Sequence, residues 1–306
     1  MKIFITSNTF FGYKNLINDQ YSYFYDQIIP FLKKKSSSDD IFVHGGNIFY
    51  NKKSINFDIL KNVLDIFDKI SDIMPIYILK SVNDEISGDI LKRIKNVIII
   101  DDYIKIDKLS IVSYNYDISK VEDNSIIIFN DNYLNNDIYK NISNDIKICT
   151  YFDDYKIYDD GILNIGSPYQ LNKNTKYEKG LLVVDTVKKK YKLLNNNFSP
   201  NFVSYNIDNI NDLNNVNIKD NDFLEIKINE NLLNNKKNIN KFNLFVNKYK
   251  RIKINYIIDN GINNKDIIYN IDNFNIRNII NNHINDMNLI EEINNVYKIH
   301  DLKNNK

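Results

Sequence analysis

The sequence predicts an α/β protein: a two-sheet sandwich followed by a small β-α-β cap and C-terminal helices. Three observations indicate this architecture. Short β-rich runs alternate with helix-period segments over the first hundred residues. From 103 to 193 the pattern changes to a series of strands with few helices, which implies a second sheet packed on the first. Beyond residue 200 the chain returns to a strand, a helix and a strand.

Four short β-rich runs and two helical segments define the first layer. The clearest helix is expected over 55–70, where apolar residues recur at spacings of three and four and Ser54 is a candidate N-cap. Another helix is expected over about 19–35, and Pro30 should bend it or end its first part. The four predicted strands are 2–6, 41–43, 76–80 and 97–100.

The second layer and the cap follow from the later runs. Strands are expected at 109–114, 125–129, 146–150, 162–165, 180–185 and 189–193. The polar stretch Asn195–Pro200 marks a boundary, so we expect a first domain over 1–195, a cap over 200–262 and a C-terminal helical segment over 263–306. Within the last two, we expect strands at 223–228 and 251–258, a helix at 237–249, and further helices at 275–285 and 288–298.

Composition bounds the function. With 306 residues, 43% hydrophobic content and a net charge of +1, the chain is typical of a globular protein with no global attraction to nucleic acid. No run approaches the roughly 18 apolar residues of a membrane span, and no secretion signal is visible. The single cysteine, Cys149, excludes an internal disulfide, so we expect a soluble intracellular protein without a membrane partner. Abundant Asn, Ile, Lys and Tyr, with no alanine, indicate an AT-rich genome such as that of a virus.

Short polar or glycine-containing segments follow several of the predicted strands. Because several successive strands carry such a segment at the same end, we expect their side chains to meet at one edge of the sandwich. The segments are 7–12, 46–50, 82–85, 129–130, 151–154 and 165–168.

In order and spacing these segments resemble the motifs of calcineurin-like metallophosphoesterases, and in particular the SbcD-type nuclease subunits and their T-even phage relatives. The first segment has the frame of D-x-H-x-G, with Asn8 and Phe10 at the aspartate and histidine positions. The second resembles G-D-x-x-D, with Asn47 replacing the metal-bridging aspartate. In the third, which resembles G-N-H-D/E, Asn83 is retained and Asp84 occupies the catalytic histidine position.

The later segments continue the resemblance. Asn130 stands where the family has the histidine of a G-H motif, and Phe152 and Asp154 fall on its G-H-x-H motif. Gly166-Ser-Pro168 corresponds to a G-S/T-P motif of the SbcD type. The resemblance implies convergence of Asn8, Asn47, Asn83, Asn130, Phe152 and Asp154 at one edge.

The resemblance implies a family that uses two Mn²⁺ ions, but most of its ligands are replaced here. Asparagine keeps an oxygen but loses the charge that offsets two dications, and phenylalanine offers no lone pair. We therefore expect no catalytic residues, no metal and no cofactor; if any cation binds, Asn83, Asp84 and Asp154 are its candidate ligands. His44 lies on a strand beside the second motif and is interpreted mainly as a packing residue.

Three functions remain open. The leading hypothesis is a pseudo-nuclease: a non-catalytic homologue of the DNA-repair and recombination nuclease that acts as a binding or scaffold subunit. Its candidate partners are an SbcC-type coiled-coil ATPase, docked by the helices at 275–298, a second copy of the chain, and DNA. The alternatives are an active metal-dependent phosphodiesterase or exonuclease with a rebuilt site, and a structural protein of a virus-like or replication assembly.

Overall fold

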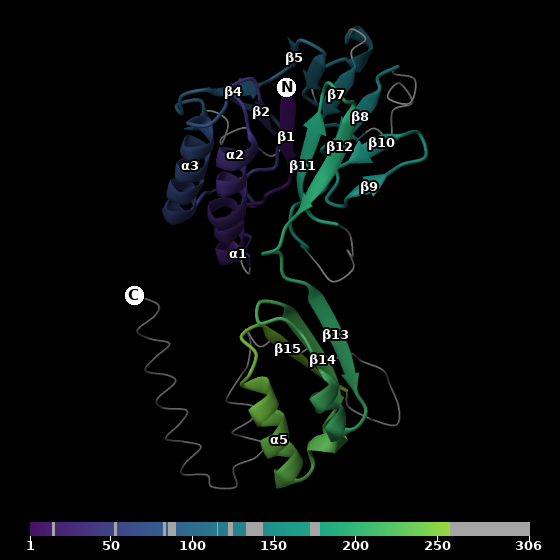
Figure 1. The fold of residues 1–306 in the computed structure, drawn as a ribbon. Helices are drawn as coiled ribbons and strands as arrows, with labels where there is room; N and C mark the ends of the chain where they lie inside the picture. The colour runs from purple at the N-terminus through teal and green to yellow at the C-terminus, as the bar shows by residue number, and fades with distance from the viewer. Residues whose placement is uncertain are drawn as a thin grey trace. The chain divides into compact units, whose positions relative to one another are not determined.

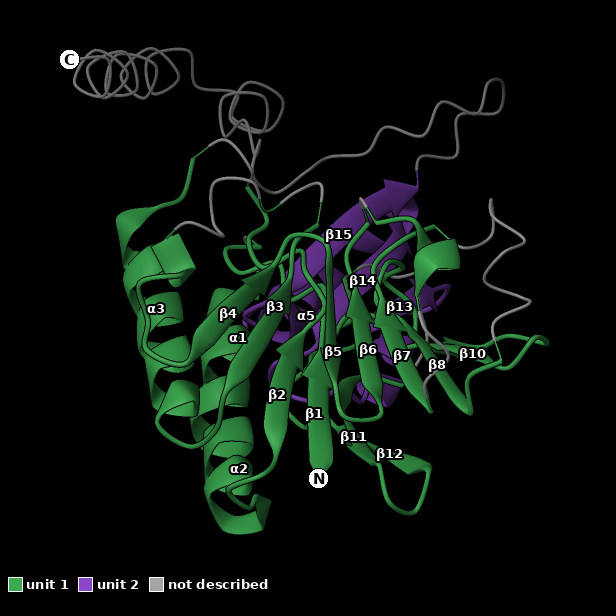
Figure 2. Ribbon diagram, turned by 90° about the horizontal axis from the view of Figure 1, so that it is seen from above, with its two compact units in different colours: residues 1–201 green, residues 202–306 purple. Residues whose placement is uncertain are grey.

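The computed structural model describes residues 1–257, except 14–15, 52–53, 82–83, 85–89, 115, 122–124, 133–142 and 172–177. The chain divides into two compact units, Met1–Asn201 and Phe202–Lys306 (Figure 2). The expected helices at 275–285 and 288–298, and the expected segment 263–306, lie outside the described residues. None of the described helices has the length and apolar content needed to cross a bilayer.

The first unit contains two six-stranded mixed sheets, which confirms the predicted sandwich (Figure 1). In the first sheet β1 to β4 and β12 run in one direction, and β11, which lies between β12 and β1, is antiparallel to both. Its strands, in spatial order, are β12 (Lys190–Asn195), β11 (Gly180–Asp185), β1 (Lys2–Thr6), β2 (Ile41–His44), β3 (Ile76–Leu79) and β4 (Val97–Ile100). The runs at 180–185 and 189–193, which the sequence pattern assigns to the second sheet, therefore belong to the first, because β11 pairs with β1.

The second sheet has a parallel centre and antiparallel edges. Its spatial order is β5 (Tyr103–Ile106), β6 (Leu109–Val112), β7 (Ile126–Phe129), β8 (Ile146–Cys149), β10 (Ile162–Asn164) and β9 (Lys156–Ile157). Alternate residues of the two sheets, including Ile3, Ile5, Ile126 and Ile128, form one fully buried core between the layers. The two edge strands β5 and β9 were not predicted from the sequence.

Two helical regions cover the other face of the first sheet (Figure 2). The expected helix at 19–35 is divided into α1 (Ile17–Ser22), a π-helical turn η1 (Tyr23–Ile28) and α2 (Ile29–Lys35). Pro30 lies in the first turn of α2, where its missing N–H leaves no bond unmade within the helix. The second helix, α3 (Phe57–Ser71), begins after Asn56, whose side chain accepts from the Asp58 N–H, so the expectation of a Ser54 N-cap is wrong.

The second unit is described up to Ile257. It contains a three-stranded parallel sheet, β13 (Phe202–Ile207), β14 (Phe223–Asn229) and β15 (Ile252–Ile257), with β14 in the centre. Helix α5 (Lys236–Val246) connects β14 to β15 and packs on one face through Phe242 and Phe245, as the predicted β-α-β unit requires. Strand β13 was not predicted from the sequence; it begins two residues after Pro200, at the start of the expected cap. Short 3₁₀ turns, η2 (Ile118–Lys120), η5 (Ile210–Asn215) and η6 (Glu230–Leu233), complete the described elements.

Candidate functional site

The loops that follow β1 and β2 are joined by backbone hydrogen bonds. The Asn8 N–H donates to the Gly46 carbonyl at 3.0 Å, and the Phe10 N–H donates to the Asn47 carbonyl at 3.1 Å. Asn8, Phe10 and Asn47 all adopt positive φ, at 51°, 44° and 56°. Asparagine tolerates this region because its short polar side chain bonds locally, whereas it is uncommon for phenylalanine. The two sequence motifs therefore lie side by side in a tightly bent pair of loops.

The side chains of Asn8 and Asn47 form a direct amide pair. Asn8 Nδ2 donates to the carbonyls of Phe152 at 2.8 Å and Thr150 at 3.3 Å, and its Oδ1 accepts from Asn47 Nδ2 at 2.6 Å. Because a carbonyl oxygen can only accept, the Asn8 group that faces it must be the NH₂ group. This fixes the orientation of both amides. Both side chains are buried, with Asn8 fully inaccessible.

Asn130 extends the pair toward the second sheet. Its Nδ2 donates to the Gly45 carbonyl at 2.5 Å and to the carbonyl and Oγ1 of Thr150 at 3.2 and 3.1 Å. The Thr150 carbonyl is therefore shared between Asn130 and Asn8. Gly45 allows this approach, since a Cβ there would lie 2.4 Å from the Thr150 Cβ. We refer to Asn8, Asn47, Asn130, Thr150 and Asn164 as the amide cluster.

Asn164, at the end of β10, closes the cluster below the loop after β8. Its Nδ2 donates to the Phe152 carbonyl at 3.2 Å and also to the Asp154 carbonyl. In the described contacts, Asp154 thus contributes its backbone carbonyl to the cluster. Gly166, with φ of +65°, lets the following segment approach this loop, because a Cβ there would lie 2.5 Å from the Asp154 carbonyl carbon. The predicted G-S/T-P segment therefore packs against the loop that carries Phe152 and Asp154.

The side chain of Asp84 fixes the conformation of the loop after β2. Its Oδ2 accepts from the Asn47 N–H at 2.6 Å and from Ser81 Oγ at 2.5 Å, and its Oδ1 accepts from the Ile48 N–H at 3.0 Å. Burial raises the pKa of the Asp84 carboxyl, and these hydrogen bonds oppose the shift. The Ser81 hydroxyl also lies 3.0 Å from Asn47 Oδ1. Both carboxylate oxygens of Asp84 are thus engaged in shaping the loop.

Two further buried polar residues brace the loop after β1. Gln20 of α1 donates from Nε2 to the carbonyls of Thr9 at 2.9 Å and Phe10 at 3.0 Å, and its Oε1 accepts from the Gly12 N–H. His44, at the end of β2, accepts the Gly46 N–H on Nδ1 at 3.2 Å, and its Nε2 lies 3.1 Å from Thr9 Oγ1.

His44 is a neutral structural residue. Because Nδ1 accepts from an N–H, the ring proton belongs on Nε2, where it is donated to Thr9. Burial lowers the pKa of His44 to about 3, so the ring is uncharged at neutral pH. The ring also contacts Phe67 of α3, at 5.8 Å between centroids. These contacts agree with its interpretation as a packing residue.

The structure brings together most of the residues that the sequence singled out. Asn8 and Asn47 touch, Asn130 shares an acceptor with Asn8, and Phe152 and Asp154 supply carbonyls to the cluster. The half-buried Phe10 lies in the bent loop, and Asn83 lies outside the described residues. Sequence reasoning missed Gln20, Ser81, Thr150 and Asn164. Thr150 follows β8 and Asn164 ends β10, so their position at the ends of predicted strands is a signal that could have identified them. Gln20 lies on a helix and carries no such signal.

Few side chains of the types that commonly bind metal ions lie in this region. Among the residues that the structure describes, no three His, Cys, Asp or Glu side chains gather closely enough to hold one cation. The cluster is made of amide and hydroxyl groups that bind one another and nearby carbonyls. It can therefore hold several loops in a fixed arrangement without a bound ion.

Comparisons with known proteins give little further information. No protein-family model matches the sequence, and no curated protein matches it. Among solved structures, the chain is similar to one from a structural and functional characterisation of a novel archaeal phosphodiesterase. The identity is 18%, the TM-score is 0.38, and the match covers 64% of this chain and 99% of that one. A likeness at this level assigns neither a family nor an activity to the chain.

Proposed function

We propose that residues 1–201 form a metallophosphoesterase-type unit, related to the SbcD-type nuclease subunits, that acts as a non-catalytic binding or scaffold subunit. The observation that carries this proposal is the Asn8–Asn47 amide pair. It lies between the loops after β1 and β2, where the resembling family places a metal-binding aspartate and its bridging aspartate. In this chain the pair is uncharged, and its described polar atoms form hydrogen bonds inside the protein.

The residues present do not fit two dications. A cation requires lone pairs, but both amide Nδ2 groups direct N–H donors into the cluster. Asn8 Oδ1 already accepts a hydrogen bond, and Phe10 and Phe152 have no side-chain lone pair to replace a histidine ligand. Two dications also require nearby negative charge, and the two oxygens of Asp84 are committed to the loop after β2. We derive no hydrolytic step from this site.

Assays of metal binding and hydrolysis test this proposal directly. We expect the full chain, with Mn²⁺ present, to hydrolyse bis(p-nitrophenyl) phosphate no faster than buffer, because the cluster offers no ligand set that activates water. Calorimetric titration should show no Mn²⁺ site tighter than the high micromolar range. The matched control is Asn8→Ala/Asn47→Ala, which should give the same background rate. Hydrolysis by the natural chain that this variant loses would instead establish the rebuilt phosphodiesterase as the function.

The partner proposal concerns residues outside the described part of the chain. By resemblance, the isoleucine-rich stripes expected at 275–285 and 288–298 would dock on the coiled coil of an SbcC-type ATPase. A chain ending after Asn273 should then stay folded by circular dichroism but no longer co-purify with the co-expressed ATPase. A matched full-length variant, Lys237→Gln on the exposed N-terminal turn of α5, should still co-purify. Unfolding of the truncated chain would assign the segment to the protein's own core instead.

A further inference from the structure

Lysines gather at the end of the first sheet where β1 begins, which is the end opposite the amide cluster. They come from the start of β1, the C-terminal turn of α2, and the β11–β12 hairpin. We call this surface the basic end and define it as Lys2, Lys33–Lys35, Lys188, Lys190 and Lys192. We infer that the basic end is a sequence-independent binding surface for the phosphate backbone of nucleic acid.

Strand register places these lysines on one face. Lys2 of β1 pairs with Asp185 of β11, which pairs with Lys190 of β12, so the three lie in one row across the sheet. Successive side chains of a strand alternate between faces, and Phe4, two residues after Lys2, packs on Phe31 of α2. The row therefore points to the side that α2 covers. Lys192, two residues after Lys190, points to the same side.

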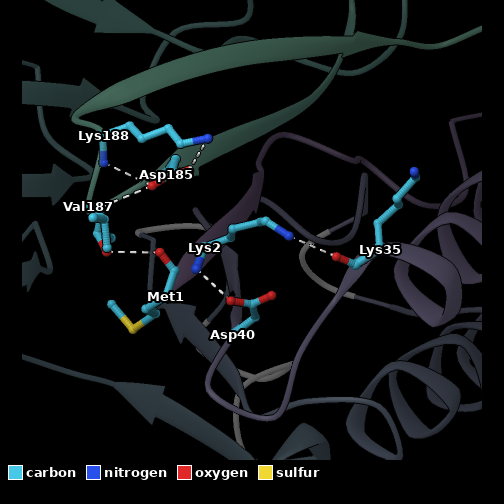
Figure 3. Close-up of polar contacts among 8 residues, drawn as sticks. Met1, Lys2, Lys35, Asp40, Asp185, Val187 and Lys188 are labelled. Atoms are coloured by element: carbon cyan, nitrogen blue, oxygen red, sulfur yellow. Dashed lines mark hydrogen bonds and ion pairs between the residues drawn. The ribbon is translucent and has the colours of Figure 1, made fainter.

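The last turn of α2 adjoins this row. The Lys2 Nζ donates to the Lys35 carbonyl at 2.9 Å, which ties the start of β1 to the end of α2. Figure 3 shows the Lys35 side chain extending away from this contact and Lys188 on the other side of Lys2, at the hairpin. Lys33 and Lys34 are exposed on the same turn. Cations from three separate segments are thus held together by backbone structure.

The nearby acids offset only part of this charge, because the seven lysines of the basic end outnumber the three acids beside them, Asp39, Asp40 and Asp185. Asp40 is 1% exposed and accepts the backbone N–H groups of Lys2 and Ser37. Asp185 accepts the N–H groups of Val187 and Lys188 in the hairpin turn, and these bonds lower its pKa (Figure 3). Asp39 is the exposed acid of the region. Within the described part of the chain, Lys33, Lys34, Lys190 and Lys192 form no ion pair.

The chemistry of the surface favours nucleic acid over other polyanions. A protein interface normally has an apolar or aromatic centre, and a membrane-binding surface carries several apolar side chains for insertion. The basic end has one exposed apolar residue, Val187, and the ring of Tyr191 alternates to the other face of β12. Mobile lysine ammonium groups suit contacts with phosphates, which give affinity without reading sequence. Because the net charge of the chain is only +1, this local concentration of lysines is what would attract a duplex.

Simpler explanations cover parts of the surface. Lysines in the last turn of a helix stabilise its dipole, and lysines on an edge strand such as β12 discourage pairing with another chain. Neither explanation requires the lysines of α2 and those of β12 to lie next to each other on one face. A binding measurement can distinguish these two explanations from the inferred function.

The test is fluorescence anisotropy with a labelled DNA duplex of arbitrary sequence and the full chain, at salt concentrations from about 0.05 to 0.2 M. Lys34→Gln/Lys190→Gln/Lys192→Gln should bind about a hundredfold more weakly at about 0.1 M salt. Its log–log salt slope should be smaller by about 2.7 than that of the natural chain. The matched control is Lys61→Gln/Lys237→Gln/Lys248→Gln, which changes the net charge equally at exposed sites away from the basic end and should bind like the natural chain.

Several outcomes would overturn the inference. They are no binding of the duplex at low salt, equal losses in the two triple variants, or binding of phosphatidylserine vesicles in place of the duplex. Melting curves of both variants establish that any loss is not a loss of folding. The basic end shares no residue with the amide cluster, so this inference and the proposed function stand or fall separately.

Discussion

Replacing Asn8 by aspartate should lower the free energy of unfolding by about 3 kcal/mol at neutral pH. The natural side chain donates to the carbonyls of Thr150 and Phe152. A carboxylate would face the same carbonyl oxygens at hydrogen-bond distance with no proton to donate, in a position with no solvent access. Restoring the residue type used by the resembling family should therefore damage this chain. Urea denaturation of Asn8→Asp and the natural chain measures the difference.

The matched control is the same chemical change at an exposed helix terminus. Asn56 caps α3 by accepting the Asp58 N–H at 2.8 Å, and aspartate caps a helix equally well. Asn56→Asp should therefore change stability by less than about 0.5 kcal/mol. If Asn8→Asp were as stable as the natural chain, or became more stable than it when Mn²⁺ was added, the cluster would be a cation site and the proposed function would be wrong.

The strand-end positions of the site could be predicted because they follow from short-range pattern. Runs such as 2–6 and 126–129 are buried at nearly every residue, and the polar residues that follow a run must lie at the sheet edge. Parallel neighbours end at the same edge, which accounts for the meeting of Asn8 after β1 and Asn47 after β2. Asn130 follows β7 of the second sheet, and the resemblance implies its place beside them. The structure brings them within one hydrogen-bonded group.

What could not be predicted is which atom of each residue serves the cluster. Asp84 was considered as a possible cation ligand, but its carboxylate binds backbone N–H groups of Asn47 and Ile48. Asp154 contributes a carbonyl to the cluster, and that contact depends on the backbone path next to Gly166. Sequence pattern specifies residue type and approximate position, whereas hydrogen-bond direction depends on loops that are distant in sequence. Gln20 shows the same limit, because nothing in a helix pattern indicates that its amide braces the loop after β1.

Hydrogen bonds to neighbouring segments hold the strained loop after β1 in place. Positive φ at Phe10 costs on the order of 1 kcal/mol or more, and it persists only where surrounding contacts determine the conformation. Here the Phe10 N–H donates to the Asn47 carbonyl, and the Phe10 carbonyl accepts from Gln20. Neutral donors and acceptors of the protein itself therefore hold this conformation.

Acid should weaken the first unit through His44 more than through an ordinary surface histidine. Burial lowers the pKa of His44 to about 3, whereas in the unfolded chain it is about 6.5. Above about pH 6.5, the pKa of histidine in the unfolded chain, His44 is neutral in both states, so its low pKa in the folded protein costs no stability. As the pH falls below about 6.5, the unfolded chain binds a proton at His44 but the folded chain does not. The slope rises to about 1.4 kcal/mol per pH unit as this uptake becomes complete, so stability should fall by about 2.3 kcal/mol between pH 6.5 and 4.5.

The measurement compares the natural chain with His44→Asn by urea denaturation at several pH values. Asparagine keeps an acceptor for the Gly46 N–H but does not titrate, so this variant should be less stable at pH 7 and should lack the His44 contribution to acid sensitivity. Both proteins retain His283, His300 and every carboxylate, so the contributions of those groups cancel in the difference. The stability gap between the two proteins should therefore narrow by about 2.3 kcal/mol from pH 6.5 to 4.5. A gap that stays constant over this range would mean that His44 takes up a proton in the folded protein, and the neutral, proton-donating role assigned to its ring beside Thr9 would be wrong.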